Sequence, residues 1–344
     1  MKKSPHWGFF RLRVFVYCYF IDFYGLKNKA TIIANQRLSE MRDFSVTILG
    51  SSAALPYKNR NLTSQIVNYA GRLFLIDCGE GTQMQLMKLK VKFMRIHHIF
   101  ISHLHGDHFY GLIGLVSTFH LLGRKEDLHI YGPPMLEQIL TLQLEASLTI
   151  LVYKVVYHQT NDFSAEILFE DEKISIASFP MSHRIPTTGF LFAEKQHPRH
   201  INLEATEKYK VPYISFNDLK AGNDFLKDDG TVVKNNLLTI EPEPPRSFAF
   251  CSDTVYHNEL AGRIQGCNLL YHEATFMSDM AEVAKAKMHS TSAEAATVAR
   301  QSGAGKLLIG HFSARYDNLL PLLEEARSVF PETYLAEEGK TYQV

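Results

Sequence analysis

Six consecutive residues place four metal-competent side chains directly after a mostly apolar segment at residues 96–101. They read His103-Leu104-His105-Gly106-Asp107-His108. Residues two apart on an extended backbone point to the same side, so His103 and His105 can bind one ion together. Residues 109–122 are mostly apolar and predict a buried helix, whose first turn favours an acid such as Asp107. The sequence therefore predicts a metal site at a strand-to-helix junction.

Two other interpretations of this run stay open. Under the first, the histidines are separate side chains on a loop, although neither packing nor capping calls for three imidazoles. Under the second, the ion only stabilises the fold, but zinc sites of that kind rely on Cys. The cysteines lie elsewhere, without paired metal spacing, at Cys18, Cys78, Cys251 and Cys267. We expect them to be reduced thiols of a cytoplasmic protein.

The spacing of the run resembles the signature of the metallo-β-lactamase superfamily, whose hydrolases build a two-metal centre on it. The resemblance implies three further ligands, each after a strand-like segment, at His183, Asp253 and His311. One ion would be held by His103, His105 and His183, the other by Asp107, His108 and His311, with Asp253 as the bridge. Superfamily members that bind iron tend to carry Glu at the place of His105, so we expect two Zn²⁺ ions per subunit, with manganese and iron as the alternatives that ligand type leaves open.

The same resemblance implies an α/β fold, a four-layer αββα sandwich with the metals at one edge of two mixed sheets. Asp77 would support the ligand loop from the end of a strand. The implied chemistry is hydrolysis, because two ions share a hydroxide of lowered pKa and stabilise an in-line displacement at phosphorus. Fold and metals do not choose the substrate, since the superfamily splits phosphodiesters, thioesters, lactams and sulfate esters.

Four further segments are similar to the ribonuclease Z family, endonucleases that trim the 3′ trailer from precursor tRNA. They are Pro56-Tyr57-Lys58-Asn59-Arg60-Asn61, His272-Glu273-Ala274-Thr275, His289-Ser290-Thr291 and His311-Phe312-Ser313-Ala314-Arg315-Tyr316. The resemblance implies that Lys58, Arg60, Asn61 and Arg315 contact the substrate near its 3′ end. Taken alone, the first segment is equally typical of a solvated, charged loop.

The resemblance also implies a mechanism. A hydroxide that bridges the metals would attack the phosphodiester and leave a 3′-hydroxyl on the tRNA and a 5′-phosphate on the trailer. Glu273 would orient His289, whose imidazolium protonates the departing 3′ oxygen. Asp107 would be a ligand that also orients the hydroxide or accepts its proton. The alternative for His289 is structural, because Ser290-Thr291-Ser292-Ala293-Glu294 is a helix-capping pattern.

Between His183 and Asp253, at about residues 194–240, we expect the projecting, tRNA-binding arm of the family, and the chain departs from the family pattern within this arm. The family's Leu-Lys-x-Gly segment is present as Leu219-Lys220-Ala221-Gly222, but its Gly-Pro motif is absent. Val211-Pro212-Tyr213-Ile214 stands nearby, so altered tip contacts are expected. Basic character comes from Lys195, His197, Arg199, His200, Lys208 and Lys210. The alternative to a tRNA-binding arm is an ordinary solvent-exposed loop.

The other departure is at residues 1–40, which precede the family's opening strand. Residues 9–24 are apolar but interrupted by Arg11 and Arg13, too short and too charged to span a bilayer. We expect Met41 to be the translated start, the alternative being an added arm or a membrane-surface anchor. Residues 41–344 would then form one catalytic domain, with more acidic than basic side chains. Phosphate affinity must in that case come from local patches and the metals.

Three functions remain for comparison. The leading one is zinc-dependent removal of 3′ trailers from precursor tRNA by an endoribonuclease. The resemblance implies that this enzyme is a homodimer, and we expect no membrane association. The second is a small-molecule phosphodiesterase or sulfatase of the same branch, which would not need the arm. A non-enzymatic scaffold or RNA-binding subunit predicts missing ligands, whereas all the ligand positions named above are intact.

Overall fold

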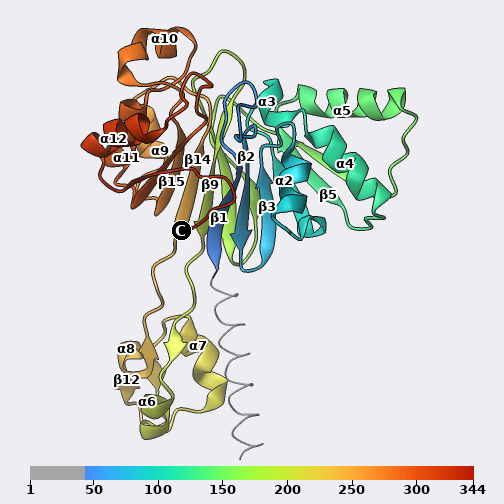
Figure 1. Ribbon diagram of the computed structural model, residues 1–344. Helices are drawn as coiled ribbons and strands as arrows, with labels where there is room; N and C mark the ends of the chain where they lie inside the picture. The colour runs from blue at the N-terminus through green and yellow to red at the C-terminus, as the bar shows by residue number, and fades with distance from the viewer. Residues whose placement is uncertain (1–42) are drawn as a thin grey trace, which may run out of the picture.

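The structure is a computed structural model that describes residues 43–344. Two seven-stranded sheets pack face to face, and helices cover their outer faces, so that the layers run αββα (Figure 1). The predicted four-layer α/β sandwich is therefore confirmed. Within these residues, none of the helices has the length and apolar character needed to cross a bilayer. The predictions for residues 1–40 and for a start at Met41 lie outside the described residues.

The first sheet has the strand order β18-β1-β2-β3-β4-β5-β6. Its strands β18, β1, β2 and β3 pair antiparallel, and β3 to β6 pair parallel. The bounds are β1 (Phe44–Gly50), β2 (Ser64–Tyr69), β3 (Arg72–Ile76), β4 (Ile96–Phe100), β5 (Leu128–Gly132), β6 (Val155–Gln159) and β18 (Thr341–Gln343).

The second sheet has the order β17-β16-β15-β14-β9-β8-β7. Its parallel half, β14 to β17, brings the carboxyl ends of these strands to one edge. The bounds are β7 (Glu166–Glu170), β8 (Ile174–Pro180), β9 (Thr188–Glu194), β14 (Ser247–Cys251), β15 (Leu269–Glu273), β16 (Lys306–Gly310) and β17 (Thr333–Leu335).

Aromatic side chains fill the space between the two sheets. Phe74 and Phe100 of the first sheet contact Phe192 of the second, with ring centroids 5.8 Å and 5.6 Å apart. Strands in the middle of both sheets are buried on both faces, as in β15, where every residue is buried. Continuous apolar runs rather than strict alternation are what such strands require.

Two outer cores attach the helices. The first sheet is covered by α2 (Thr82–Lys88), α3 (Gly106–Phe109), α4 (Leu112–Leu121) and α5 (Met135–Ala146), with η1 (Phe93–Arg95) before β4. The second is covered by α9 (Glu259–Arg263), α11 (Ser292–Ser302) and α12 (Leu320–Val329). Between β15 and α11 lie η3 (Ser278–Met280) and α10 (Ala281–Ala286).

The helix predicted at residues 109–122 is present but divided. It forms α3 and α4, separated by Tyr110 and Gly111, and α4 buries Leu112, Leu115, Val116 and Phe119. A Cβ atom at Gly111 would lie 2.2 Å from the carbonyl oxygen of Gly79. The close backbone approach therefore requires glycine here, and it holds the loop after β3 against the ligand loop.

Helix α11 begins with the capping box that its sequence predicts. Thr291 is the N-cap residue, its side chain accepts a hydrogen bond from the Glu294 amide, and the Glu294 carboxylate accepts one from the Thr291 amide. This capping box satisfies the exposed amides of the first turn. The cap uses Thr291 and Glu294, so the imidazole of His289 is left for another role.

The insertion between β9 and β14 leaves the sandwich on two extended segments and folds into a small separate unit (Figure 1). Its core is formed by Leu219, Val233 and Leu238. Its elements are β10 (His200–Ile201), α6 (Leu203–Lys208), η2 (Tyr213–Ser215), α7 (Phe216–Lys220), β11 (Phe225–Leu226), β12 (Val232–Val233), α8 (Asn235–Leu238) and β13 (Thr239–Ile240).

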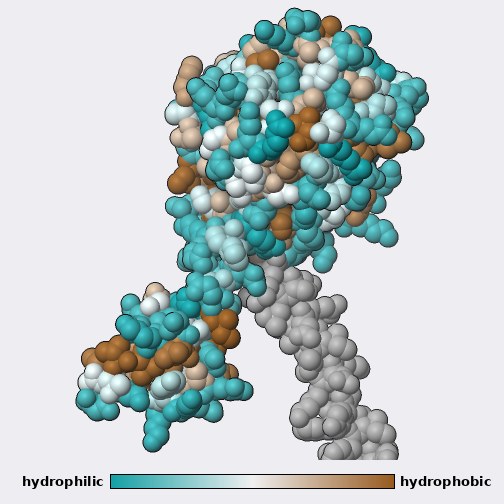
Figure 2. Space-filling view, turned by 90° about the vertical axis from the view of Figure 1, so that its left-hand side faces the viewer, coloured by the Kyte–Doolittle hydropathy of each residue, from teal (hydrophilic) through white to brown (hydrophobic). Residues whose placement is uncertain are grey.

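The surface of this arm is apolar as well as charged (Figure 2). Tyr213 and Ile214 are 84% and 86% exposed. Over residues 194–240, Asp and Glu side chains are as numerous as Lys and Arg. The arm thus has basic residues, as the sequence indicated, but no excess of positive charge.

Candidate metal centre

Five chain segments deliver the predicted ligands to one edge of the sandwich. His103 and His105 follow β4, while Asp107 and His108 open α3. The remaining ligands follow strands of the second sheet, His183 after β8, Asp253 after β14 and His311 after β16. Because β14 and β16 are members of one parallel set, their carboxyl ends place Asp253 and His311 at the same edge. All seven side chains meet there.

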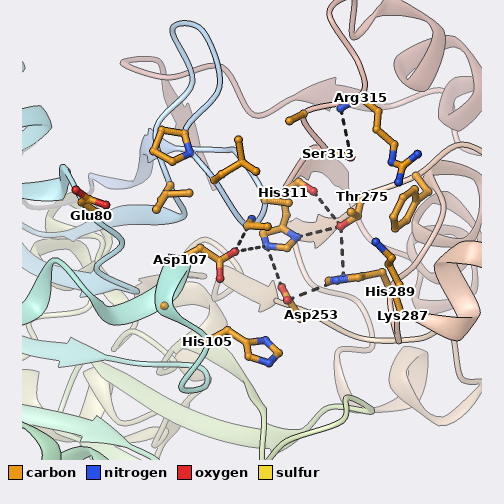
Figure 3. Close-up of a pocket in the computed structure, with 18 of the residues that line it drawn as sticks. Glu80, His105, Asp107, Asp253, Thr275, Lys287, His289, His311, Ser313 and Arg315 are labelled. Atoms are coloured by element: carbon orange, nitrogen blue, oxygen red, sulfur yellow. Dashed lines mark hydrogen bonds and ion pairs between the residues drawn. The ribbon is translucent and has the colours of Figure 1, made fainter.

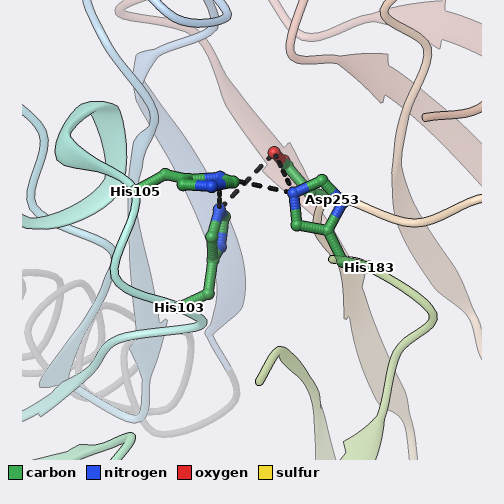
Figure 4. Close-up of side chains that lie close together, drawn as sticks. All are labelled: His103, His105, His183 and Asp253. Atoms are coloured by element: carbon green, nitrogen blue, oxygen red, sulfur yellow. Dashed lines mark hydrogen bonds and ion pairs between the residues drawn. The ribbon is translucent and has the colours of Figure 1, made fainter. Parts of the chain in front are cut away.

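One cluster consists of His103, His105, His183 and Asp253 (Figure 4). The Nδ1 atom of His105 lies 3.0 Å from Nε2 of His103 and 3.3 Å from Nε2 of His183. Two nitrogens bound tetrahedrally to one zinc ion are about 3.3 Å apart, given Zn–N bonds of about 2.0–2.1 Å. The three imidazoles are therefore spaced as ligands of one ion.

The second cluster consists of Asp107, His108 and His311. Nε2 of His311 lies 3.2 Å from Nε2 of His108 and 3.3 Å from Oδ2 of Asp107. Figure 3 shows Asp107 and His311 facing each other across the floor of a cavity. This mixed nitrogen and oxygen donor set also suits a zinc ion.

Asp253 divides its two carboxylate oxygens between the clusters. Oδ2 lies 3.5 Å from Nε2 of His103, whereas Oδ1 lies 3.2 Å from Nε2 of His311 and 3.4 Å from Nε2 of His108. One carboxylate therefore faces both groups of histidines. The placement fits the bridging role that the resemblance implied.

The ring nitrogens that face away from the clusters have partners of their own. Nδ1 of His183 donates to the carbonyl of Met288 at 2.8 Å, and Nδ1 of His108 lies 2.7 Å from Asp77. Nδ1 of His311 lies 3.0 Å from the Thr275 hydroxyl. Such contacts fix the tautomer and the ring orientation of metal-binding histidines. Together with the donor set and its spacing, they show that the residues fit two metal ions.

Electrostatics favour the ligand forms of several side chains. Burial, together with neighbouring histidines, lowers the pKa of His105 to about 4. Burial also lowers the pKa of His183 to about 4. Although burial raises the pKa of Asp253, the positive fields of His311, His108 and His103 outweigh it and hold the pKa well below its usual range. Neutral His105 and His183 and an ionised Asp253 are the states that metal binding needs. Although burial lowers the pKa of His108, the carboxylates of Asp107, Asp253 and Asp77 outweigh it and raise the pKa well above its usual range, so this imidazole must lose its proton when a metal binds.

Beside the centre, His289 and Glu273 form a buried pair. Nδ1 of His289 lies 2.9 Å from Oε1 of Glu273, which also accepts hydrogen bonds from the amides of Thr254 and Ser290. Burial lowers the pKa of His289, but the Glu273 carboxylate outweighs it and raises the pKa to about 9. The Glu273 carboxylate therefore favours the protonated imidazole, which lines the cavity over the metal centre.

That cavity has a volume of about 820 Å³. Of the predicted substrate-binding residues, Arg315 lines it, but Lys58, Arg60 and Asn61 do not. Their loop lies alongside, since Pro56 does line the cavity. Lys58 pairs with Asp317 at 2.8 Å, Arg60 lies 3.3 Å from the carbonyl of Ser313, and Asn61 donates to Glu338 at 2.6 Å.

Two cations that the sequence reasoning missed also line the cavity, Arg184 and Lys287. A signal for both was present in the sequence. Arg184 directly follows the ligand His183, and Lys287 stands two residues before His289. A charged residue next to a ligand is easily taken for solvated surface, and only the fold shows that these two side chains share one cavity.

Fold and site together define a metallo-β-lactamase-fold protein with a candidate two-metal centre. The structure is similar to the short form of human tRNase Z, with a TM-score of 0.64 and 31% identity over 87% of this chain and 99% of that chain. The fold alone is shared with the metallo-β-lactamase fold protein YhfI from Bacillus subtilis, with a TM-score of 0.62 and 19% identity over 88% of this chain and 100% of that chain.

Sequence relatives give the narrower assignment. Ribonuclease Z from Bacteroides fragilis is 47% identical over 87% of this chain and 98% of the relative. Ribonuclease Z from Phocaeicola vulgatus is 48% identical over 87% of this chain and 96% of the relative. Residues 44–196 also match the family described as Anti-Pycsar protein Apyc1. The chain belongs to the ribonuclease Z family.

Proposed function

We propose that this protein is the endoribonuclease that removes 3′ trailers from precursor tRNA, leaving a 3′-hydroxyl on the tRNA and a 5′-phosphate on the trailer. The contact between His289 and Glu273 carries the proposal. It supports a role of His289 as proton donor, because His289 lines the same cavity as Asp107, Asp253 and His311. Membership of the ribonuclease Z family supports precursor tRNA as the substrate.

The metal ligands in this proposal are the seven side chains of the two clusters, and the cofactor is two Zn²⁺ ions per subunit. His103, His105 and His183 would hold one ion, Asp107, His108 and His311 the other, and Asp253 both. When bound, ions of this kind lower the pKa of water towards neutrality and stabilise charge on phosphoryl oxygens. Imidazole and carboxylate donors without Cys suit a catalytic zinc site.

Two side chains of the protein act on protons and water in this scheme. His289, held by Glu273, donates a proton to the departing 3′ oxygen. Asp107 accepts a hydrogen bond from the Ala54 amide at 2.7 Å, which fixes its carboxylate at the cavity floor. Since neighbouring His108 and His311 hold the pKa of Asp107 far below its usual range despite burial, this carboxylate orients the attacking water rather than serving as a strong base.

Substrate contacts are assigned to two regions. Arg315 lines the cavity and would meet a phosphate there, while Lys58 and Arg60 would meet phosphates along the adjoining loop. Asn61 would hold that loop in place through Glu338. The arm at about residues 194–240 would bind the body of the tRNA. We further propose that residues 41–344 form one catalytic domain that works as a cytoplasmic homodimer.

The test is a cleavage assay on a precursor tRNA with a short 3′ trailer, with and without a chelator, mapped to the nucleotide. Chelator-sensitive cleavage immediately 3′ to the discriminator base, with a 3′-hydroxyl on the tRNA, is the expected result. Bis(p-nitrophenyl) phosphate serves as the parallel substrate. Hydrolysis of this small diester by a protein that leaves the precursor intact would overturn the tRNA assignment in favour of a small-molecule phosphodiesterase.

A further inference from the structure

The cavity over the metal centre contains two cations that the proposed mechanism has not used. Arg184 and Lys287 line the cavity together with Arg315. Arg184 directly follows His183, and Lys287 directly precedes Met288. The imidazole of His183 donates to the carbonyl of Met288 at 2.8 Å. A single hydrogen bond therefore ties the two cation-bearing segments together at the rim of the metal centre.

These cations share with Arg315, and not with Lys58 or Arg60, a side chain without a protein partner among residues 43–344. Within residues 43–344, neither Arg184 nor Lys287 forms a side-chain hydrogen bond or an ion pair. Lys58, in contrast, pairs with Asp317 at 2.8 Å, and Arg60 donates to the Ser313 carbonyl. Lys and Arg side chains without a competing carboxylate are the ones most available to phosphate groups.

Their position in the cavity indicates which phosphates they can reach. Figure 3 shows Lys287 and His289 on one side, with Asp107 and Glu80 on the other. In the proposed reaction His289 protonates the departing 3′ oxygen, so the tRNA strand leaves on the side of His289. In an in-line displacement the attacking water stands opposite that oxygen, on the side of Asp107. Positive charge at Lys287 thus lies on the tRNA side of the cleaved bond.

We propose that Arg184 and Lys287 bind the phosphates of the tRNA strand immediately 5′ to the cleavage site and hold its 3′ oxygen beside His289. This inference rests on the proposed function, and it assigns to the His183 and Met288 segments a substrate-binding role. The two cations recognise the backbone charge of the strand and not its bases, so they act on every precursor alike. Their contribution must weaken as salt competes for the phosphates.

The salt dependence of precursor cleavage tests the proposal. Arg184→Ala and Lys287→Ala are each expected to raise KM and to reduce the slope of log kcat/KM against log salt concentration by about one. Lys287→Arg, which keeps the charge, should restore the slope. Lys285→Ala is the matched control, because Lys285 is exposed on α10, two residues before Lys287, and does not line the cavity. It should behave as the parent protein does.

Two further measurements locate the contact. The defect of Lys287→Ala should be equal for precursors with short and with long trailers, and mature tRNA should inhibit this variant less strongly than it inhibits the parent. An unchanged salt slope would overturn the inference, and so would a defect confined to long trailers, which would put the cations on the trailer side. A parent protein that leaves the precursor intact would overturn the proposed function, and this inference with it.

Discussion

Asp77 and His108 form a fully buried pair behind the metal centre, with Oδ2 of Asp77 2.7 Å from Nδ1 of His108. The other carboxylate oxygen accepts a hydrogen bond from the Ser102 amide at 2.8 Å. Asp77 itself has a left-handed backbone, with φ of 53°. The pair fixes the ring whose Nε2 faces His311, so the geometry of the second cluster depends on a residue that is not one of its ligands.

Asp77→Asn is therefore expected to weaken metal binding by about 10–100-fold, the usual effect of losing such an outer partner. Asn tolerates a positive φ nearly as well as Asp does, so the change removes the charge without straining the backbone. Competition with a chromogenic chelator measures the affinity. The control is Asp171→Asn, which removes a carboxylate paired with Arg72 away from the site. Equal affinities of parent and Asp77→Asn would contradict the assignment.

Removal of the metal ions is expected to lower the melting temperature, because the ions bind the folded site and not the separated ligands. Free metal at about 100 times its Kd contributes about 2.7 kcal/mol per site to the free energy of unfolding. Thermal unfolding before and after chelation, with zinc added back, measures the effect. Asp253 faces both clusters, so the melting temperature of the Asp253→Asn variant should change much less on addition of the chelator. A chelated parent protein that melts as before, despite complete metal loss, would refute this expectation.

His289→Ala is expected to slow precursor cleavage by about 10²–10⁴-fold in kcat, the usual contribution of a general acid. Bis(p-nitrophenyl) phosphate has a leaving group that departs without protonation, so its hydrolysis should fall much less. Glu273→Gln should show the same contrast in a milder form, since it weakens the hold on the His289 proton. Equal losses on both substrates would point to a structural role for His289 instead.

The Asn61 side chain is expected to stabilise the loop at residues 56–61 rather than to read the substrate. It donates to Oε2 of Glu338 at 2.6 Å, and the Asn61 amide donates to Oε1 at 2.7 Å. Asn61→Ala and Glu338→Ala should each lower the free energy of unfolding by about 1–3 kcal/mol. The double variant should lose less than the sum of both, as contacting residues do. If the two losses of unfolding free energy, measured by urea unfolding, were additive in the double variant, the contact between Asn61 and Glu338 would not contribute to stability.

A pH-dependent stability is expected from His98, whose ring stacks on His129 with centroids 5.1 Å apart. Burial, together with His129, His97 and His158, lowers the pKa of His98 to about 3. Below about pH 6.5 the unfolded chain binds a proton that the folded protein does not bind until about pH 3. The free energy of unfolding should therefore fall as the pH drops through this window, by at most about 1.4 kcal/mol per pH unit.

His98→Phe should remove that part of the pH dependence and keep the packing against Phe74 and Phe169. The loss of the 3.3 Å contact between His98 Nδ1 and the Tyr131 hydroxyl should lower the free energy of unfolding by a similar amount at each pH. Urea unfolding at about pH 7.5 and about pH 5.5 compares the variant with its parent on either side of the unfolded pKa. His200→Phe, at an exposed position on the arm, is the control. A parent and a variant with parallel pH profiles would exclude His98 as the cause.

Much of the fold follows from local patterns. The apolar runs that end at ligand positions predict strand ends, and β4, β14 and β16 occupy those runs. The helix expected at residues 109–122 is interrupted at Gly111, because the Gly111 amide donates to the carbonyl of Cys78 at 2.9 Å instead of to its own helix. Periodicity cannot report that contact, since it is made between two loops.

The sequence likewise predicts only part of the candidate site. The resemblance named His183, Asp253 and His311 from motifs, and the structure brings them next to His103 and His105. The resemblance did not indicate that Lys58 is paired with Asp317 or that Asn61 is hydrogen-bonded to Glu338. Nor did it identify Arg184 and Lys287 as cavity residues. These assignments depend on which side chains face each other across loops, and a motif does not carry that information.

The sequence by itself determined the ligand types and the paired placement of His103 and His105, because residues two apart on an extended chain share a side. Only the tertiary structure decided that one carboxylate, Asp253, faces both groups of histidines, and that Lys287 stands beside His289 in a common cavity. The physical reason is the packing of two sheets. It brings the ends of strands far apart in the chain to one edge, where distances of a few ångströms set the chemistry.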